Sequence, residues 1–126
     1  MITKIETESA PAAIGPYSQA VKAGDFIYCS GQIPLVPGTA NLVEGGVAEQ
    51  TVQVMENLKQ VLLAAGSDFD SVVKTTIYLA DMNDFATVNE QYSAYFGAIA
   101  PARATVQVAA LPKGALVEID AVAHLG

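Results

Sequence analysis

The chain is 126 residues long, 52% of them apolar, and carries a formal net charge of −7 with only six basic residues. That length is typical of one domain with one core, and the acidic balance argues against a protein that binds nucleic-acid phosphates. No apolar run approaches the roughly 20 residues of a membrane-spanning helix, and no secretory signal is recognisable. We therefore expect a single cytoplasmic domain over residues 1–126, without nucleic-acid or membrane partners.

The first 46 residues predict short strands joined by loops. Residues 2–6 favour an edge strand, and residues 10–16 contain two prolines and a glycine, which is typical of a loop. Residues 18–22 and 26–30 flank a glycine-containing turn and predict a β-hairpin. Residues 36–46 contain further proline and glycine and predict a second loop.

The middle of the chain predicts two amphipathic helices with a strand between them. Apolar residues recur at helical spacing over residues 47–65. Residues 71–79 are rich in β-branched side chains and predict a central strand. A second helix, capped by Asp81 or Asn83, should end at Gly97. Its apolar stripe would consist of Phe85, Val88, Tyr92, Tyr95 and Phe96.

Two alternating strands are predicted near the end of the chain, over residues 103–109 and 116–124. Arg103 and Thr105 share one face of the first strand, and Glu118 lies on the polar face of the second. The element order predicts an α+β fold, in which both helices pack on one face of a mixed β-sheet. Oligomerisation would cover the other face.

Few side chains offer catalytic chemistry. His124 is the only histidine, so neither a histidine metal cluster nor a histidine-based triad is expected. The nucleotide-binding glycine motifs are missing as well. Cys29, the only cysteine, lies among apolar residues of a predicted strand, and we interpret it as a buried structural thiol. We expect no metal site.

Arg103, the only arginine, and Glu118 are the strongest remaining candidates. Their strands are expected to be adjacent and antiparallel. An arginine can hold a carboxylate through two parallel hydrogen bonds, and a nearby carboxylate can position water and transfer protons. The residues by themselves favour the alternative of a surface salt bridge, and they give Asp120 no role beyond a surface charge. Tyr17 lies in a glycine-containing loop, where a lone tyrosine is more often a packing residue than a functional one.

Six short blocks resemble the RidA/YjgF family of reactive intermediate deaminases. They occur in the order of that family, cover essentially the whole chain, and are GPYSQA (15–20), SGQIP (30–34), NDFATVN (83–89), PAR (101–103), LPK (111–113) and EI (118–119). The resemblance implies a chorismate-mutase-like α+β fold. It also implies a homotrimer in which the sheets line a central barrel and three clefts lie between subunits.

The resemblance further implies roles for individual residues. Arg103 would bind the substrate carboxylate and Glu118 would activate water as the catalytic group. The other substrate-binding residues it implies are Tyr17, Ser30, Gly31, Asn89 and Thr105. Thr105 stands where many bacterial members carry a ligand-contacting cysteine, and its hydroxyl can still donate and accept a hydrogen bond.

The implied reaction is the hydrolytic deamination of 2-aminoacrylate, 2-iminopropanoate and 2-iminobutanoate to 2-ketoacids and ammonium. No cofactor is expected, because the imine carbon is already electrophilic. The alternative is a non-catalytic protein that binds or senses small carboxylates such as 2-ketoacids, which would need Arg103 but not Glu118. A ribonuclease or translation inhibitor is disfavoured by the acidic charge.

Overall fold

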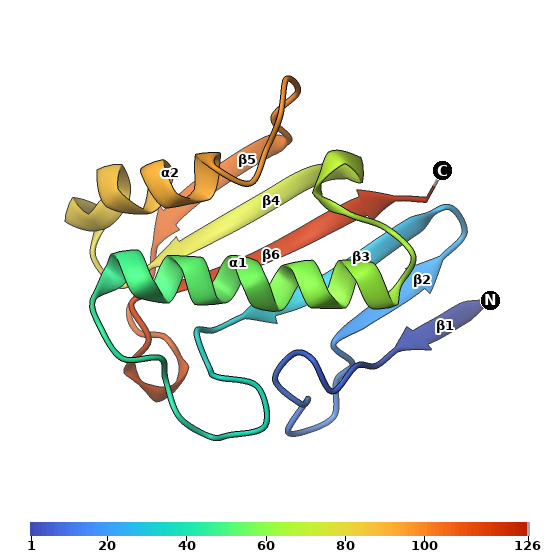
Figure 1. Ribbon diagram of the computed structural model, residues 1–126, viewed down its shortest axis with the longest axis horizontal. Helices are drawn as coiled ribbons and strands as arrows, with labels where there is room; N and C mark the ends of the chain where they lie inside the picture. Colours follow the sequence, from blue (N-terminus) through green and yellow to red (C-terminus); the bar gives the residue numbers. More distant parts are fainter. Residues whose placement is uncertain (126) are drawn as a thin grey trace.

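The computed structural model describes residues 1–125, which form a six-stranded mixed sheet with two helices on one face (Figure 1). Gly126, the last residue of the predicted domain, lies outside the described residues. The strands are β1 (Ile2–Ile5), β2 (Ala20–Ala23), β3 (Phe26–Gln32), β4 (Val72–Leu79), β5 (Ala102–Gln107) and β6 (Val117–His124). Their order across the sheet is β1-β2-β3-β6-β4-β5, and only the β4–β5 pair is parallel. The expected α+β fold is confirmed.

The two helices, α1 (Val47–Ala64) and α2 (Phe85–Ser93), lie in front of the sheet in the view of Figure 1. Helix α1 ends as predicted, because Gly66 adopts a φ of 83° that glycine tolerates without strain. Three 3-10 turns complete the chain: η1 (Phe69–Ser71), η2 (Met82–Asp84) and η3 (Pro112–Gly114). Within the described residues, no helix combines the length and apolar character needed to cross a membrane.

The core lies between the helices and the sheet. Alternate residues of β6 face it, as the sequence pattern predicted, and each is at most 2% exposed: Val117, Ile119, Ala121 and Ala123. The facing stripe of α1 is fully buried and consists of Val54, Met55, Leu58, Val61 and Leu62. Burying one such side chain stabilises the fold by about 1.5–3 kcal/mol, so this layer holds β6 rigidly.

The second face of the sheet carries no helix within residues 1–125. Glu118, Asp120 and Val122 of β6 lie there half-buried. Tyr28 and Val106 extend the same face through the register of β3 and β5 and are 48% and 41% exposed. This surface, called the open face below, therefore mixes exposed apolar groups with carboxyl groups.

The prediction that the strands of Arg103 and Glu118 are adjacent and antiparallel was wrong. Strand β4 separates them, and β5 runs parallel to β4. The reason is the crossover: a strand that follows β4 and α2 returns parallel to β4 and lands at the sheet edge.

The second helix also differs from its prediction, because it ends at Ser93 rather than near Gly97. Tyr95 and Phe96 follow the helix and pack against Phe69 with ring centres 5.4 Å apart. Asp81 accepts a hydrogen bond from the Asn83 amide at 2.9 Å, but this caps η2 rather than α2.

Candidate active site

Arg103 points toward α2 from the edge strand β5. It lies opposite Thr75, whose hydroxyl is 2.7 Å from that of Tyr92 on α2, so Arg103 and Thr75 face the helices. The Arg103 guanidinium donates to the side-chain oxygen of Asn89 at 2.6 Å. Its central carbon lies 5.2 Å from the ring centre of Tyr92 and 5.5 Å from that of Phe85. One face of α2 therefore orients the guanidinium through cation–π contacts and one hydrogen bond.

The charge of Arg103 stays available to an anion. The guanidinium is exposed, and within residues 1–125 the only ion pair joins Lys4 to Glu6 at 2.9 Å. The platform below the guanidinium is fixed, because Tyr92 is buried and its hydroxyl bonds to that of Thr75 at 2.7 Å. A fixed, unpaired guanidinium suits a small carboxylate, which it can hold through two hydrogen bonds.

Thr105 lies on the same face of β5, two residues beyond Arg103. Its hydroxyl oxygen is buried and forms no hydrogen bond with any described residue. It borders a narrow crevice that Arg103 and Asn89 also line. A buried hydroxyl without a partner is costly, and this crevice is too narrow to admit a water molecule that would supply one.

Glu118 occupies the open face, opposite Tyr78 of β4. Its side chain lies against Gly31 of β3: a Cβ atom at position 31 would be 2.9 Å from the Glu118 Cδ and would overlap the carboxylate. A side chain at position 31 would therefore displace the Glu118 carboxylate from this position.

A β-bulge places Gly31 beside Glu118. Ser30 and Gly31 of β3 lie opposite the single residue Asp120 of β6, which bends the strand locally. The Ser30 hydroxyl donates to the Ser18 carbonyl at 2.6 Å, and the Ser30 amide donates to the Gln19 carbonyl at 3.0 Å. The bulge thus ties the loop that contains Tyr17 to the strand next to Glu118.

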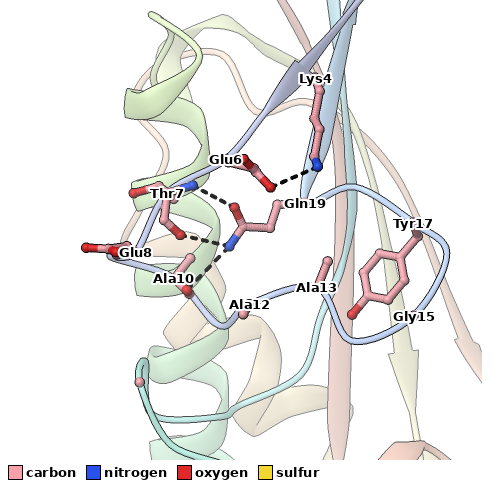
Figure 2. Close-up of a pocket in the computed structure, with 11 residues that line it drawn as sticks. Lys4, Glu6, Thr7, Glu8, Ala10, Ala12, Ala13, Gly15, Tyr17 and Gln19 are labelled. Atoms are coloured by element: carbon pink, nitrogen blue, oxygen red, sulfur yellow. Dashed lines mark hydrogen bonds and ion pairs between the residues drawn. The ribbon is translucent and has the colours of Figure 1, made fainter.

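Tyr17 is 53% exposed and follows a glycine turn in which Gly15 has a φ of 125°. The Tyr17 amide donates to the Gly15 carbonyl at 2.9 Å. Figure 2 shows the Tyr17 ring bordering a cavity of about 820 Å³ beside β1. Neither Arg103 nor Glu118 lines this cavity, so within one chain it is not where those two groups could react.

Gln19 holds the wall of this cavity together. Its side-chain oxygen accepts from the Thr7 amide at 2.7 Å, and its amide nitrogen donates to the Thr7 and Ala10 carbonyls at 3.0 and 3.3 Å (Figure 2). The same nitrogen lies 2.7 Å from the Pro11 carbonyl oxygen. Gln19 is 3% exposed. Its role is structural, since these bonds use its polar atoms to fix the loop that presents Tyr17.

The environment of Glu118 favours proton uptake. Burial and, secondly, the negative charge of Asp120 raise the pKa of the half-buried Glu118 carboxyl above its ordinary value. A carboxyl shifted in this direction exchanges a proton more readily near neutral pH. Asp120 was predicted to be only a surface charge, although its position two residues after Glu118 already placed two carboxyl groups on one face of a strand.

The remaining reactive groups do not form a further centre. Cys29 is buried, as predicted, and burial raises its pKa to about 12. Among residues 1–125, no cluster of three or more histidine, cysteine, aspartate or glutamate side chains is placed to hold a metal ion.

Within one chain the candidate residues form two separate groups on opposite faces of the sheet, so the expected salt-bridge alternative for Arg103 and Glu118 was wrong. The arginine half-site, on the helix-covered face, consists of Arg103, Asn89 and Thr105. The glutamate half-site, on the open face and the bulge beside it, consists of Ser30, Gly31 and Glu118. Tyr17 belongs to neither group, although its loop is joined to the bulge through the hydrogen bonds of Ser30.

A six-stranded mixed sheet with two helices on one face defines a small α+β domain. The chain belongs to the RidA/YjgF family: the family model described as endoribonuclease L-PSP matches residues 7–125. The 2-iminobutanoate/2-iminopropanoate deaminase of Mus musculus is 59% identical over 122 residues, which cover 97% of this chain and 90% of the mouse protein.

Solved structures agree with this membership. The structure of YyfA from Yersinia pestis, described as a protein of unknown function of the conserved Rid protein family, has a TM-score of 0.96 at 52% identity and covers 99% of this chain and 100% of its own. Escherichia coli TdcF, solved with bound serine, has a TM-score of 0.93 at 42% identity, with 98% and 99% covered. The predicted family resemblance is thereby confirmed.

Proposed function

We propose that residues 1–126 act as one domain that hydrolyses 2-aminoacrylate, 2-iminopropanoate and 2-iminobutanoate to 2-ketoacids and ammonium. The observation that carries the proposal is the pair of half-sites: an unpaired, oriented Arg103 suits the carboxylate that these substrates share, and Glu118 suits proton transfer. The mouse relative, named 2-iminobutanoate/2-iminopropanoate deaminase, supports this substrate class.

The separation of the half-sites supports a homotrimer with the active site between subunits. Side chains on opposite faces of a sheet cannot both contact one small imino acid, so a second copy would have to bring its glutamate half-site to Arg103. In the trimer the open face would line a central barrel and cover the exposed Tyr28 and Val106. Light scattering should give about three times the chain mass of 13.1 kDa; a fully active monomer would contradict the proposal.

Substrate binding begins at Arg103, which holds the carboxylate through two hydrogen bonds and orients the neighbouring C=N carbon. The enamine 2-aminoacrylate becomes the corresponding imine by taking a proton at its terminal carbon and losing one from its nitrogen. The backbone around Gly31 and Thr105 holds the nitrogen end.

Hydrolysis then uses Glu118 as the general base. Glu118 takes a proton from water while the water oxygen bonds to the imine carbon and the C=N pair of electrons moves to nitrogen. Glu118 returns the proton to nitrogen, which gives a tetrahedral intermediate with an amino and a hydroxyl group. Glu118 then takes the hydroxyl proton and passes it to the same nitrogen, while the carbon–oxygen double bond forms and the carbon–nitrogen bond breaks. Ammonia leaves and is protonated in water, and the 2-ketoacid remains.

A coupled assay tests this function. A dehydratase generates 2-aminoacrylate in the assay, and pyruvate formation is followed with and without the protein, with no cofactor added for this chain. We expect the protein to accelerate pyruvate release above the spontaneous rate. No acceleration, combined with calorimetric binding of a 2-ketoacid, would instead establish the carboxylate-binding or sensing alternative.

We further propose that the enzyme acts in the cytoplasm, with the imine substrate and its own copies as partners. The single cysteine, buried and without a second cysteine to pair with, is compatible with a reducing compartment. The family description names an endoribonuclease, but the net charge of −7 and the single arginine argue against a nucleic-acid partner.

A further inference from the structure

Tyr78 and Asp120 lie on the open face beside Glu118, and the reaction steps above use neither side chain. Asp120 follows Glu118 by two residues in β6, so the two side chains point the same way with backbones roughly 7 Å apart. Tyr78 of β4 lies directly opposite Glu118. Its hydroxyl nevertheless donates to the Asp120 carboxylate at 3.0 Å, diagonally across the strand pair.

The charges around this cluster are unbalanced. Asp120 contributes a carboxylate from the same strand as Glu118, β4 contributes the neutral Tyr78, and the bulge of β3 contributes only Gly31. The basic group of β4 on this face, Lys74, lies beyond Asp120 and donates to Thr76 at 3.4 Å. Within residues 1–125 neither carboxylate forms an ion pair.

We propose that Tyr78 and Asp120 are positioning residues for Glu118: the Tyr78 hydroxyl fixes the Asp120 carboxylate, and the charge of Asp120 makes the Glu118 carboxyl a stronger base. The inference rests on the proposed deaminase function and deepens it.

The electrostatics agree with the geometry. The pKa of Glu118 is raised by burial and next by the charge of Asp120. Burial and the hydrogen bond to Asp120 raise the pKa of Tyr78, which keeps its hydroxyl protonated as a donor. Covering of the open face in the trimer would remove water and strengthen both interactions. The Arg103 that a second copy would bring to this site would lower the pKa of Glu118, but it would do so in the wild type and in Asp120→Asn alike.

The substitution Asp120→Asn removes the charge but keeps the shape and an acceptor for Tyr78. We expect the acidic limb of the kcat/KM profile of the intact oligomer to move to lower pH, because Glu118 loses a neighbouring like charge. Asp25→Asn, in the exposed turn after β2, changes the net charge equally and should leave the profile in place. An unchanged profile for an active Asp120→Asn enzyme overturns the inference and leaves the deaminase function standing.

A readout without turnover separates the two proposals. Carbon-13 NMR of the Glu118 carboxyl, assigned by its loss in Glu118→Gln, should show a lower titration midpoint in Asp120→Asn than in the wild type. A midpoint that stays or rises overturns the role of Asp120, whether or not the wild type is active. A wild type without deaminase activity overturns the proposed function instead.

Tyr78→Phe tests whether the Tyr78 hydroxyl fixes the Asp120 carboxylate. Without its donor, the Asp120 carboxylate can turn toward water, so we expect a smaller shift of the acidic limb in the same direction as for Asp120→Asn. In the Asp120→Asn background, Tyr78→Phe should add no further shift, because no carboxylate remains to be fixed. Additive shifts would show that Tyr78 does not act through Asp120.

Discussion

The two half-sites place their charged groups in opposite electrostatic environments. The arginine half-site holds an exposed cation with neutral groups, namely one amide oxygen and two aromatic rings. The glutamate half-site holds a half-buried carboxyl beside a second carboxyl and against a glycine. Binding a carboxylate needs a positive charge that is held in place but has no partner in the protein. Proton transfer by a carboxylate is helped when its pKa is raised, because it then takes up a proton more readily.

Each half-site also lacks a partner of opposite charge for its own charged group. Arg103 has no carboxylate partner and Glu118 has no cation partner within residues 1–125. A substrate with a carboxylate at one end and a protonatable nitrogen at the other would fit between them. The following variants test whether the arginine half-site serves binding and the glutamate half-site serves proton transfer.

The largest effect is expected at Arg103. Replacing it with alanine removes both hydrogen bonds to the substrate carboxylate, and kcat/KM should fall by roughly 10²–10⁴-fold, since hydrogen bonds to charged groups are the strong ones. The melting temperature should stay near that of the wild type, because the side chain is exposed. Arg103→Lys should also lose most activity; a lysine variant with wild-type kcat/KM would rule out the two-pronged contact.

Glu118→Gln should divide catalysis from binding. Glutamine keeps the size and one acceptor oxygen but cannot take a proton near neutral pH. Turnover should fall by about 10²-fold or more, the scale of a lost general base. Calorimetry should show 2-ketoacid binding close to that of the wild type. Hydrolysis at the wild-type rate would remove Glu118 from the mechanism.

Gly31→Ala should displace Glu118 without touching Arg103. The added Cβ would overlap the carboxylate, and a shift of this size should lower kcat between roughly 10- and 100-fold. Gly24→Ala is the control for a glycine substitution elsewhere in the hairpin: its positive φ of 60° predicts lower stability with kcat retained. A Gly31→Ala enzyme with unchanged kcat would show that the carboxylate position is not critical.

Asn89→Ala should give the smallest effect. It removes one hydrogen bond that orients an exposed guanidinium, so KM should rise by roughly three- to tenfold, as expected for a loss of about 1 kcal/mol. The kcat should change little, because Glu118 is on the other face. A loss confined to kcat would place Asn89 in the chemical step rather than in binding.

Much of this fold could be predicted from the sequence, because the alternation or helical spacing of apolar residues indicates which side of each element is buried. The buried face of β6 and the stripe of α1 were predicted for that reason. The same patterns cannot say which strands are neighbours, so the position of β4 between β5 and β6 was missed.

The candidate site residues were likewise predicted one by one, and their division into an arginine half-site and a glutamate half-site was not. Alternation assigns Arg103 and Glu118 to a face of their own strands, but it does not relate one strand's faces to another's. The contact between Tyr78 and Asp120 joins residues 42 positions apart through the sheet register, which no local pattern encodes. The space available to a side chain at position 31 is likewise limited by Glu118, which is distant in the sequence but adjacent in the structure.

Mixed oligomers of Arg103→Ala and Glu118→Gln chains distinguish a site shared between subunits from one within a chain. If Arg103 of one copy works with Glu118 of the next, random equal mixing gives an intact pair at about a quarter of the sites (½ × ½) in a cyclic oligomer. We therefore expect co-expression of the two inactive variants to restore about 25% of wild-type kcat per site. Activity no higher than that of the parent variants would contradict a site built from two subunits.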